Sequence, residues 1–522
     1  GDDSVRGEAN GDFYYGGSGS NGYIPTDNIG SIVFDASVGT ITSTSGVDYV
    51  EDFIVFGTES NDEFYGRDNP IPDFLDWFTV YVDDDTFPYH IIDLFGPRGG
   101  DNKIVGGTGI DGVSYYGSNY GLSVDMTTNS VSHSNGSTDS ISNIDLIVAT
   151  DQDDTLIGDN KDNFFALFNG NDVVTGGDGL DTVNFNGDSI KASLMDGLVT
   201  ALNPDTSPNF GTKTLTSIEN LVGTHGDDKL FGNHLANYLS GDQGHDQIDG
   251  GGGDDYLIGN KGNDILIGGI GSNALDGGAG DDTIILKGSG TFSDDLAAYN
   301  TTSTLQTGTE ESINLDGKTR FGDVMDGGAN VDTVELTDGS DAFFLHDSFS
   351  GFHSSLTLVE DYDSRLGTAR IANIENINSG LGDDIVDLTS PNYSLDGQDI
   401  TVDGGSGNDT LWGSDANETL KGGEGDDALF GGAGTNVLTG GAGADEFQFT
   451  GSSTNDTVKD FSLLDGDTLK FFSTGGALFD RSSVGLNGDV LSISDGAEVL
   501  TITLEGAGLQ MADLGSDVLI IG

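Results

Sequence analysis

The 522-residue sequence contains no cysteine, and it has only 18 lysines and arginines against 88 aspartates and glutamates. The absence of cysteine excludes disulfide staples. The formal net charge of −70 excludes nucleic acid as a favourable partner, because phosphate groups need cationic contacts. No run of about eighteen apolar residues is present, so the sequence predicts no transmembrane segment.

Glycine and acidic residues dominate what is there, with 84 glycines in the chain. Low aliphatic content combined with high net charge normally predicts disorder, because the chain repels itself and buries little apolar surface. A regular repeat changes this prediction if cations neutralise the acidic positions. The chain is therefore expected to be disordered without a bound cation and folded with it, since a ligand of the native state alone stabilises that state.

Residues 223–285 repeat every nine residues, and each unit begins with glycine. The glycine-rich half of the unit predicts a turn, because glycine allows positive φ and close approach of neighbouring backbones. The other half predicts a brief strand with one large apolar side chain, which only stacked units can enclose. The sixth place holds Asp228, Asn237, Asp246, Asp255, Asp264, Asn273 and Asp282, and the eighth holds Leu230, Leu239, Ile248, Leu257, Leu266, Leu275 and Ile284.

Stacking also aligns the sixth-place carboxylates, which repel one another unless a cation lies between them. Asp carboxylates together with turn carbonyls suit calcium better than magnesium or zinc, because calcium accepts many oxygen ligands in flexible geometry. An ordinary Gly/Asp-rich loop or a disordered tract is the alternative. Seven units in unbroken register argue against it.

The nonapeptide has the form G-G-x-G-x-D-x-U-x and resembles the RTX (repeats-in-toxin) family of calcium-binding parallel β-rolls. The resemblance implies that each ion lies between successive turns on one side of the roll. We therefore expect an all-β fold in which calcium-bound parallel β-roll (β-solenoid) blocks are interrupted by β-rich inserts and followed by a C-terminal β cap. Multiple Ca²⁺ ions are the expected cofactors.

A second block covers residues 404–448, with Asp409, Glu418, Asp427, Asn436 and Asp445 in the sixth place. Asn lacks charge and Glu is longer, and Leu235 replaces glycine in the first block, so these units are weaker candidates. The predicted metal ligands are Asp111, Asp154, Asp172, Asp181, Gly226, Asp228, Gly244, Asp246, Gly253, Asp255, Gly262, Asp264, Gly280, Asp282, Asp332, Asp384, Gly407, Asp409, Gly425, Asp427 and Asp445.

Between the blocks lie segments rich in alternating and β-branched residues, which predict metal-free coils or side hairpins that extend the same sheets. The expected order is N-terminal roll turns with a first β insert (1–65), a Pro/aromatic insertion (66–105), roll units with two β inserts (106–222), the main calcium roll (223–285), an irregular insert (286–326), a β insert with degenerate units (327–403), the second calcium roll (404–448) and a C-terminal cap with a secretion signal (449–522).

Residues 66–105 hold half of the prolines and a cluster of aromatic residues. Proline fits poorly in a roll strand, which predicts an insertion that leaves the solenoid. A small satellite core is the favoured explanation of the aromatic cluster, and an exposed contact surface is the alternative. The irregular insert contains a Thr/Ser-rich run at 301–309.

Both ends of the sequence carry signals. Gly1, Asp3 and Val5 occupy the fourth, sixth and eighth places of a unit, which predicts further chain before Gly1, with a trimmed natural end as the alternative. The segment from 449, with Asp456, Asp460-Phe461, Asp465 and Asp467, resembles the strand segment that closes the roll in RTX proteases and related exported proteins. The acidic–apolar end at 517–522 resembles the uncleaved signal of type I secretion, with a final capping strand as the alternative.

The sequence contains no H-E-x-x-H, G-x-S-x-G or phosphate-loop pattern, so no enzyme is predicted. His225, His234 and His245 fall at turn positions of the repeat and are not expected to bind one metal ion together.

Two functions remain. The favoured one is a calcium-rigidified structural protein of the bacterial surface, such as an S-layer, surface filament or adhesin. It would be exported by type I secretion, with self-association or cell-surface and polysaccharide contacts. The alternative is the non-catalytic C-terminal export and stability module of a secreted lyase, epimerase or protease. The number of inserts and the two long blocks favour the first.

Overall fold

The computed structural model describes strands within residues 3–65, and then residues 91–97, 100–107, 109–205, 207–288, 290–291, 315, 317–345, 370–389, 394–395, 397–450, 455–472, 480–494 and 499–521. These residues form strands, turns and a short 3-10 helix, η3 (Met511–Asp513). The prediction of an all-β chain of parallel rolls is confirmed. The chain divides into two compact units, Gly1–Ile248 and Asp249–Gly522. No helix in the described part is long and apolar enough to cross a membrane.

The first unit contains a fully parallel sheet. Its strands, in spatial order, are β1 (Asp3–Gly7), β3 (Asn21–Pro25), β7 (Ile54–Phe56), β9 (Ile91–Gly96), β11 (Ile110–Ser114), β15 (Leu146–Val148), β17 (Phe164–Leu167), β19 (Thr182–Phe185), β23 (Asn220–Val222) and β25 (Tyr238–Ser240).

The strands of the second sheet alternate along the chain with those of the first. They are β2 (Phe13–Tyr15), β4 (Val33–Asp35), β5 (Thr40–Thr42), β6 (Val47–Glu51), β8 (Glu63–Tyr65), β10 (Lys103–Val105), β12 (Leu122–Asp125), β13 (Ser130–His133), β14 (Thr138–Ser142), β16 (Thr155–Ile157), β18 (Val173–Thr175), β20 (Ile190–Ser193), β21 (Leu198–Ala201), β22 (Thr212–Thr216) and β24 (Lys229–Phe231). Strand β26 (Gln247–Asp249) includes the boundary between the units.

The β-rich inserts of the first unit enter this second sheet as antiparallel meanders. Strand β14 pairs in parallel with β10, then antiparallel with β13, which pairs with β12, and β12 pairs in parallel with β16. The strands β22, β21 and β20 repeat this arrangement between β18 and β24. Each insert therefore places three strands in the second sheet where a regular rung has one. The strand after the insert pairs in parallel again.

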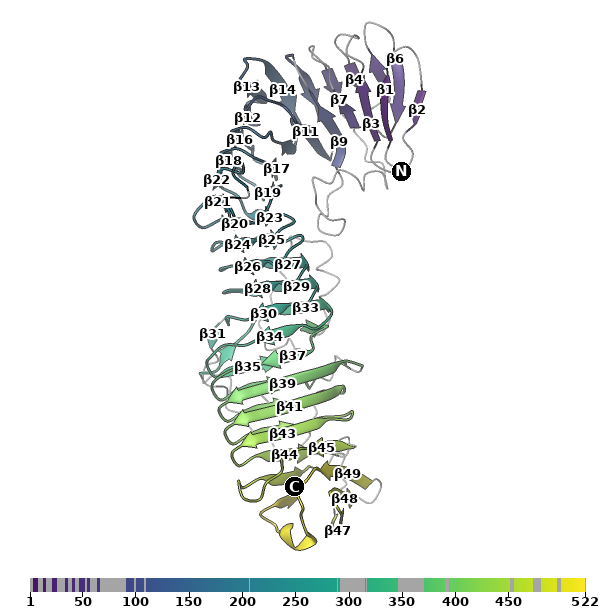
Figure 1. Cartoon of the computed structure of the whole chain (residues 1–522), viewed down its shortest axis with the longest axis vertical. Coiled ribbons are helices and arrows are strands. Elements are labelled where there is room, and N and C mark those ends of the chain that lie inside the picture. The colour runs from purple at the N-terminus through teal and green to yellow at the C-terminus, as the bar shows by residue number, and fades with distance from the viewer. Residues whose placement is uncertain are drawn as a thin grey trace. The chain divides into compact units, whose positions relative to one another are not determined.

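The second unit contains three sheets, and its strands stack as rungs, as Figure 1 shows for β39, β41 and β43. The first sheet holds β27 (Tyr256–Lys261), β29 (Ala274–Ala279), β33 (Val324–Ala329) and β36 (Ile371–Ala372). The second holds β28 (Ile265–Ile267), β30 (Thr283–Ile285), β34 (Thr333–Glu335), β37 (Asn376–Asn378), β39 (Asp399–Ser406), β41 (Asn417–Glu424), β43 (Val437–Ala442), β45 (Asp456–Val458), β47 (Asp480–Asn487), β48 (Val490–Ser494) and β49 (Val499–Leu504).

The third sheet holds β31 (Gly290–Thr291), β32 (Thr319–Arg320), β35 (Asp341–Phe344), β38 (Ile385–Asp387), β40 (Thr410–Trp412), β42 (Ala428–Phe430), β44 (Glu446–Phe449), β46 (Thr468–Phe471) and β50 (Leu519–Ile521). From β32 to β38 the chain visits all three sheets in turn, and from β39 to β46 it alternates between the second and third. The roll therefore exchanges one of its two sheets within this unit.

The eighth-place side chains form the core, as the repeat predicts. Leu230, Leu239, Leu257 and Leu266 are fully buried. In the second block the corresponding Leu411, Leu420, Leu429, Leu438 and Phe447 are fully buried too. Burying a leucine side chain contributes about 1.5–3 kcal/mol, so each rung gains stability only when a neighbour covers it.

Two predicted inserts contain roll strands at their ends. Residues 91–105 lie within the predicted insertion 66–105, yet β9 pairs with β7 and β11, and β10 pairs with β8. The reason is local, because the proline content falls after Pro88 and the apolar run Ile91–Gly96 ends before Pro97. In the insert 286–326, β33 begins at Val324 and belongs to the first sheet.

Several predictions fall outside the described residues. These are the aromatic cluster before residue 91, the Thr/Ser-rich run 301–309, and the turns of the N-terminal units.

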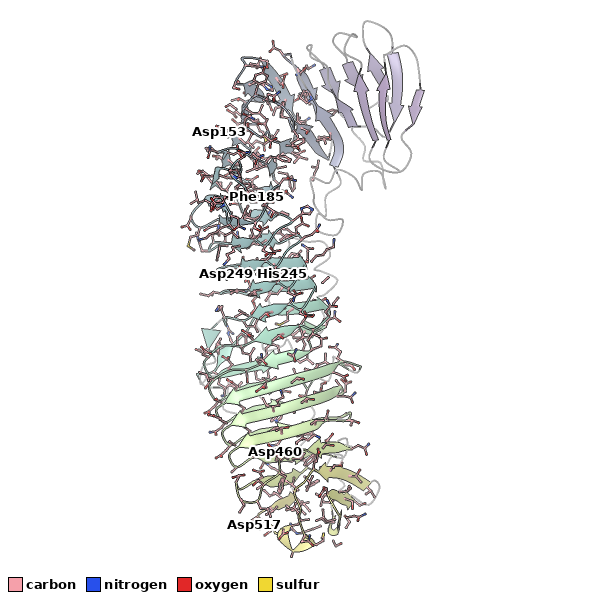
Figure 2. All side chains as sticks on the ribbon, in the orientation of Figure 1. Asp153, Phe185, His245, Asp249, Asp460 and Asp517 are labelled. Atoms are coloured by element: carbon pink, nitrogen blue, oxygen red, sulfur yellow. The ribbon has the colours of Figure 1, made fainter. Side chains whose placement is uncertain are left out.

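The segment after 449 continues the stack through its acidic residues. The Asp460 side chain, labelled in Figure 2, accepts hydrogen bonds from the backbone N–H groups of Gly440 and Gly441, each at 2.9 Å. Strand β50 pairs in parallel with β46 and adds a strand to the third sheet. Residues Leu519–Ile521 therefore form the last strand of the third sheet among the described residues, and the roles of this segment as a cap and as a secretion signal stay predictions.

Candidate metal-binding turns

The sixth-place residues form ladders along the edges of the rolls. The backbone N–H of Asp409 donates to Oδ1 of Asp427 at 2.8 Å, and the N–H of Asp427 donates to Oδ1 of Asp445 at 3.0 Å. These partners are 18 residues apart, which is one rung of two nine-residue units. A continuous run of such hydrogen bonds joins Asp341, Asp384, Asp409, Asp427, Asp445 and Asp467.

The second oxygen of several ladder carboxylates is buried without a hydrogen-bond partner. This holds for Oδ2 of Asp384, Asp409 and Asp427, whose residues are no more than 2% exposed. A buried charged oxygen with no donor is strongly unfavourable unless a cation compensates it. The same is true of Oδ2 of Asp181, Asp282, Asp332 and Asp456.

The pKa values of these carboxyl groups are raised by burial among like charges. Burial and then the charges of Asp384 and Asp427 raise the pKa of Asp409 to about 8, against the hydrogen bond from the Asp384 N–H. Burial raises the pKa of Asp384 to about 7 and that of Asp427 to about 6. Near pH 7, a proton therefore competes with a metal cation for each of these carboxylates.

Glycine in the first place of the unit leaves room beside these oxygens. A Cβ atom on Gly404 would lie 2.5 Å from Oδ2 of Asp409 and 2.6 Å from the carbonyl oxygen of Gly422, one rung further on. The carboxylate and the carbonyl therefore converge on the side of glycine where other residues carry a side chain. A Cβ atom on Gly277 would meet Asp282 and Gly327 in the same way.

This donor set fits calcium, which takes six to eight oxygen ligands from carboxylates and carbonyls. Within the described ranges, no group of three or more His, Cys, Asp or Glu side chains could hold a metal ion. An ion between the turns would therefore take one or two carboxylates and complete its shell with backbone carbonyls. The turn glycines expose such carbonyls, and Gly407 (φ 134°) and Gly425 (φ 131°) hold backbone angles that favour glycine.

Replacing Gly404 with alanine is expected to destabilise the calcium-loaded protein by about 1–3 kcal/mol, because the methyl group overlaps both oxygens. Gly397 is the matched control, since it has φ 90° and a methyl group added there would meet no heavy atom within 4 Å. Its replacement by alanine costs only backbone strain, about 1 kcal/mol, and leaves calcium affinity unchanged. Urea unfolding and calcium titration measure the two effects, and equal calcium affinity in both variants would contradict the site geometry.

Not every acidic turn leaves an oxygen without a donor. Thr337 donates to Oδ2 of Asp341 through its backbone N–H (2.7 Å) and its hydroxyl (2.9 Å). Thr150 donates to Oδ2 of Asp154 through its backbone N–H (2.8 Å) and its hydroxyl (3.0 Å). Thr224 likewise donates to Asp228 through its N–H and its hydroxyl. The turns of Thr150 and Thr224 directly follow the inserts that contain β12–β14 and β20–β22, so threonine closes the first turn after each of these inserts within the chain itself.

In the asparagine turns, the side-chain Nδ2 donates a hydrogen bond at the position where an aspartate has its second carboxylate oxygen. Nδ2 of Asn273 donates to Oδ1 of Asp323 at 2.7 Å, and Nδ2 of Asn436 donates to Oδ1 of Asp456 at 3.0 Å. Glu418 differs from both, because burial raises its pKa to about 7 and its Oε2 has no hydrogen-bond partner. That the Asn units bind calcium less well than the Asp units stays a prediction.

The fourteen predicted carboxylates are all at most 2% exposed. They differ in what faces the second carboxylate oxygen. Asp181, Asp282, Asp332, Asp384, Asp409 and Asp427 have the unpartnered oxygen, Asp154 and Asp228 are closed by threonine, and Asp172 faces a lysine. Asp111, Asp246, Asp255, Asp264 and Asp445 are buried on the same edges. Of the predicted turn glycines, Gly244, Gly253, Gly262, Gly280, Gly407 and Gly425 have positive φ, whereas Gly226 is not among the positive-φ glycines.

The repeat pattern missed acidic residues that complete the ladders. Asp323 accepts from the Asn273 N–H at 2.9 Å and is buried, yet its unit KTRFGDVMD lacks glycine in the first, second and fourth places. Only the acid in the sixth place and Met325 in the eighth signal it. Glu375 and Glu219, which accept from the N–H groups of Asp332 and Asp181, lie in insert segments outside the nonapeptide pattern. Both stand in an Ile-Glu-Asn triplet at the end of an insert, which is the signal that could have found them.

A model of the RTX calcium-binding nonapeptide repeat (four copies) matches residues 144–187, 216–248, 232–266, 249–284, 401–427 and 412–447. The matched segments contain both predicted calcium blocks, apart from a few terminal residues, and part of the region before the first block. No curated protein matches the sequence significantly.

Among solved structures, the chain is similar to the extracellular lipase LipA from Serratia marcescens. The two are 20% identical over 57% of this chain, with a TM-score of 0.18. The match spans only 40% of the lipase chain. A likeness at this TM-score carries no argument about fold or activity.

Proposed function

Because the chain carries RTX calcium-binding nonapeptide repeats, we propose that it is a secreted structural protein of the bacterial cell surface, such as an S-layer, filament or adhesin component. In this proposal, extracellular calcium binds the aspartate turns and makes the rolls rigid. Blocks 223–285 and 404–448 are the calcium-loading parts of the chain, and the inserts supply contacts to other copies or to surface polysaccharide.

The observation that carries the proposal is the row of buried carboxylate oxygens at Asp384, Asp409 and Asp427, which have no hydrogen-bond donor. Bound calcium would supply the positive charge that these oxygens require. The residues themselves hold the oxygens in place through the N–H to Oδ1 ladder, and the glycines keep the adjoining space open.

The rise in calcium concentration on export would make the chain bind calcium and fold only outside the cell. Extracellular calcium modules bind at about 10⁻⁴–10⁻³ M, far above cytosolic calcium. With a net charge of −70, the chain would stay unfolded and competent for type I secretion inside the cell and would fold outside.

Electron microscopy and small-angle scattering of the purified chain test the structural role. In millimolar calcium we expect ordered rolls that associate into sheets or filaments, and in magnesium alone we expect neither. A variant with Asp384, Asp409 and Asp427 replaced by asparagine is the matched control and should associate less. Folded but strictly monomeric protein in calcium would contradict the structural role, and a catalytic domain in the longer gene product would favour an export module of a secreted enzyme.

A further inference from the structure

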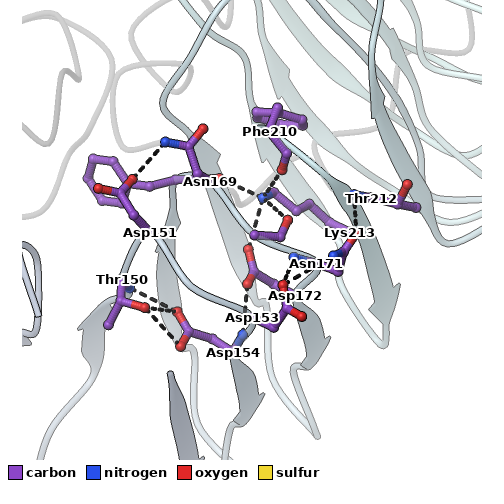
Figure 3. A network of polar contacts seen from close by, with 12 residues as sticks. Thr150, Asp151, Asp153, Asp154, Asn169, Asn171, Asp172, Phe210, Thr212 and Lys213 are labelled. Atoms are coloured by element: carbon purple, nitrogen blue, oxygen red, sulfur yellow. Dashed lines mark hydrogen bonds and ion pairs between the residues drawn. The ribbon is translucent and has the colours of Figure 1, made fainter. Parts of the chain in front are cut away.

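One buried lysine lies on an acidic turn of the first unit. The side chain of Lys213, in strand β22, is fully buried although the chain has few basic residues. Its Nζ donates to the carbonyl oxygens of Phe168 (2.5 Å), Gly170 (2.8 Å) and Phe210 (2.7 Å), and lies 3.0 Å from Oδ2 of Asp172 (Figure 3).

The strand register places this lysine where the ladder would continue. Val173 pairs with Thr214, and the Thr214 N–H donates to the Asp172 carbonyl at 2.8 Å. One rung earlier, the Val173 N–H donates to the Asp154 carbonyl at 2.9 Å. Lys213 therefore occupies the sixth place on the rung after Asp172, where a regular unit would carry another acid.

Three of the four acceptors around Nζ come from one repeat unit, and the fourth is the carbonyl of Phe210. Phe168, Gly170 and Asp172 are the second, fourth and sixth places of unit 167–175, and they contribute two carbonyls and a carboxylate. Such a set of oxygens is typical of a calcium ligand shell. An ammonium has three N–H donors and carries the charge that the carboxylate requires, whereas a neutral amine has only two.

The charges of the pair support each other inside the protein. Burial lowers the pKa of Lys213, and the charge of Asp172 opposes that shift. Burial raises the pKa of Asp172 to about 6, opposed by Lys213. The ring of Phe210, whose centroid is 4.3 Å from Nζ, adds a cation–π contact.

In the second unit, a buried arginine also lies where the chain re-enters the roll after an insert. Arg370 is 2% exposed, and its Nε donates to the carbonyl of Asp323 at 2.7 Å. Its Nη2 donates to the carbonyl of Phe321, and its guanidinium lies over the ring of Phe343. Phe321 and Asp323 are the fourth and sixth places of their unit, so a side-chain cation again faces turn carbonyls.

We propose that Lys213 holds the position of a bound cation at the Asp172 turn, so that this rung closes without calcium, and that removing the lysine leaves a divalent-cation site there. The inference rests on the proposed calcium function. It adds that the rungs of Lys213 and Arg370 carry their own cation and remain ordered when calcium is absent. The first unit would then keep a calcium-independent rung on which calcium-dependent rungs stack.

Equilibrium dialysis with radioactive calcium tests the site in the full chain. We expect Lys213→Ala to bind one more calcium ion per chain than the wild type. Lys161→Ala is the control. The Lys161 side chain is 53% exposed, and its Nζ lies 3.6 Å from Oδ1 of Asp145, so it does not fill a buried turn position. It should bind the wild-type number. Equal stoichiometry in folded Lys213→Ala and wild type would overturn the proposal.

Hydrogen exchange of the wild type in chelator gives a readout that needs no variant. Amides of β18 and β22 should exchange at least tenfold more slowly than those of β40 and β42, which flank the Asp409 and Asp427 turns. Equal exchange rates would overturn the proposal even if Lys213→Ala fails to fold. A wild type that binds no calcium would overturn the proposed function instead, while slow exchange at β18 and β22 would still support the role of Lys213.

Discussion

Replacing Asp409 with asparagine is expected to destabilise the calcium-loaded protein and to stabilise the calcium-free protein. The amide oxygen of asparagine can accept the ladder hydrogen bond from Asp384 N–H, as Asn273 and Asn436 already accept from Asp255 and Glu418. The lost charge removes calcium from the turn, which costs about 2.7 kcal/mol when calcium is at 100 times its Kd. Without calcium, and above pH 8 where Asp409 is ionised, the same change removes a buried uncompensated charge and gains about 1–3 kcal/mol.

The control is Asp403→Asn on strand β39. The Asp403 side chain is 42% exposed and lies 3.5 Å from Nζ of Lys421, so its loss should change stability by less than about 1 kcal/mol in either condition. Urea unfolding with and without calcium measures both variants. Destabilisation of Asp409→Asn by the same amount in both conditions would show that the carboxylate has only a structural hydrogen-bonding role.

Acidification is expected to stabilise the calcium-free protein between pH 8 and pH 5. The pKa values of Asp409, Asp384 and Asp427 are raised to about 8, 7 and 6, above the 3.8 of an unperturbed aspartate. The folded state therefore holds more protons than the unfolded state across this range, and the free energy of unfolding falls as pH rises. Protons take the place of the cation, so β-sheet signal lost at pH 8 should return near pH 5.

Calcium should reverse this dependence. Binding requires deprotonated carboxylates, so calcium affinity falls on acidification, and the stability advantage of the loaded protein shrinks from pH 8 to pH 5. Circular dichroism and urea midpoints of protein freed from calcium on a chelating resin, with and without added calcium, measure both curves. A calcium-free protein that becomes less stable on acidification would contradict the buried, unpartnered state of these oxygens.

The repeat predicts the parts of the structure that depend on local spacing. A period of nine with glycine first places Asp409 in a turn and Leu411 in the core, and both follow from stacking alone. The burial of the predicted carboxylates has the same origin, because each turn is covered by the next rung. The calcium assignment also depends only on residue types that recur at fixed positions.

Long-range partners could not be predicted from spacing. Alternation in Thr212–Thr216 places Lys213 on the same strand face as Leu215, but the carbonyls of Phe168 and Gly170 that it contacts are 45 and 43 residues earlier, so spacing does not identify these partners. The exchange of sheets between β32 and β38 has no sequence signal either, since every sheet uses the same short apolar strands. In both cases the pairing across an insert decides the outcome.

Near-identical rungs create a problem of alignment during folding, because sliding one strand pair by 18 residues would still match apolar with apolar and glycine with glycine. The buried ammonium of Lys213 makes such a slip costly in its part of the roll. Its contacts with the carbonyls of Phe168 and Gly170 and with Asp172 form only when β22 lies beside β18. In an alignment shifted by one rung it would face Asp154, whose carboxylate already accepts hydrogen bonds from Thr150, so the ammonium would lose its ion pair. A single basic residue thus distinguishes one rung from its copies and selects the correct alignment from the near-equivalent ones.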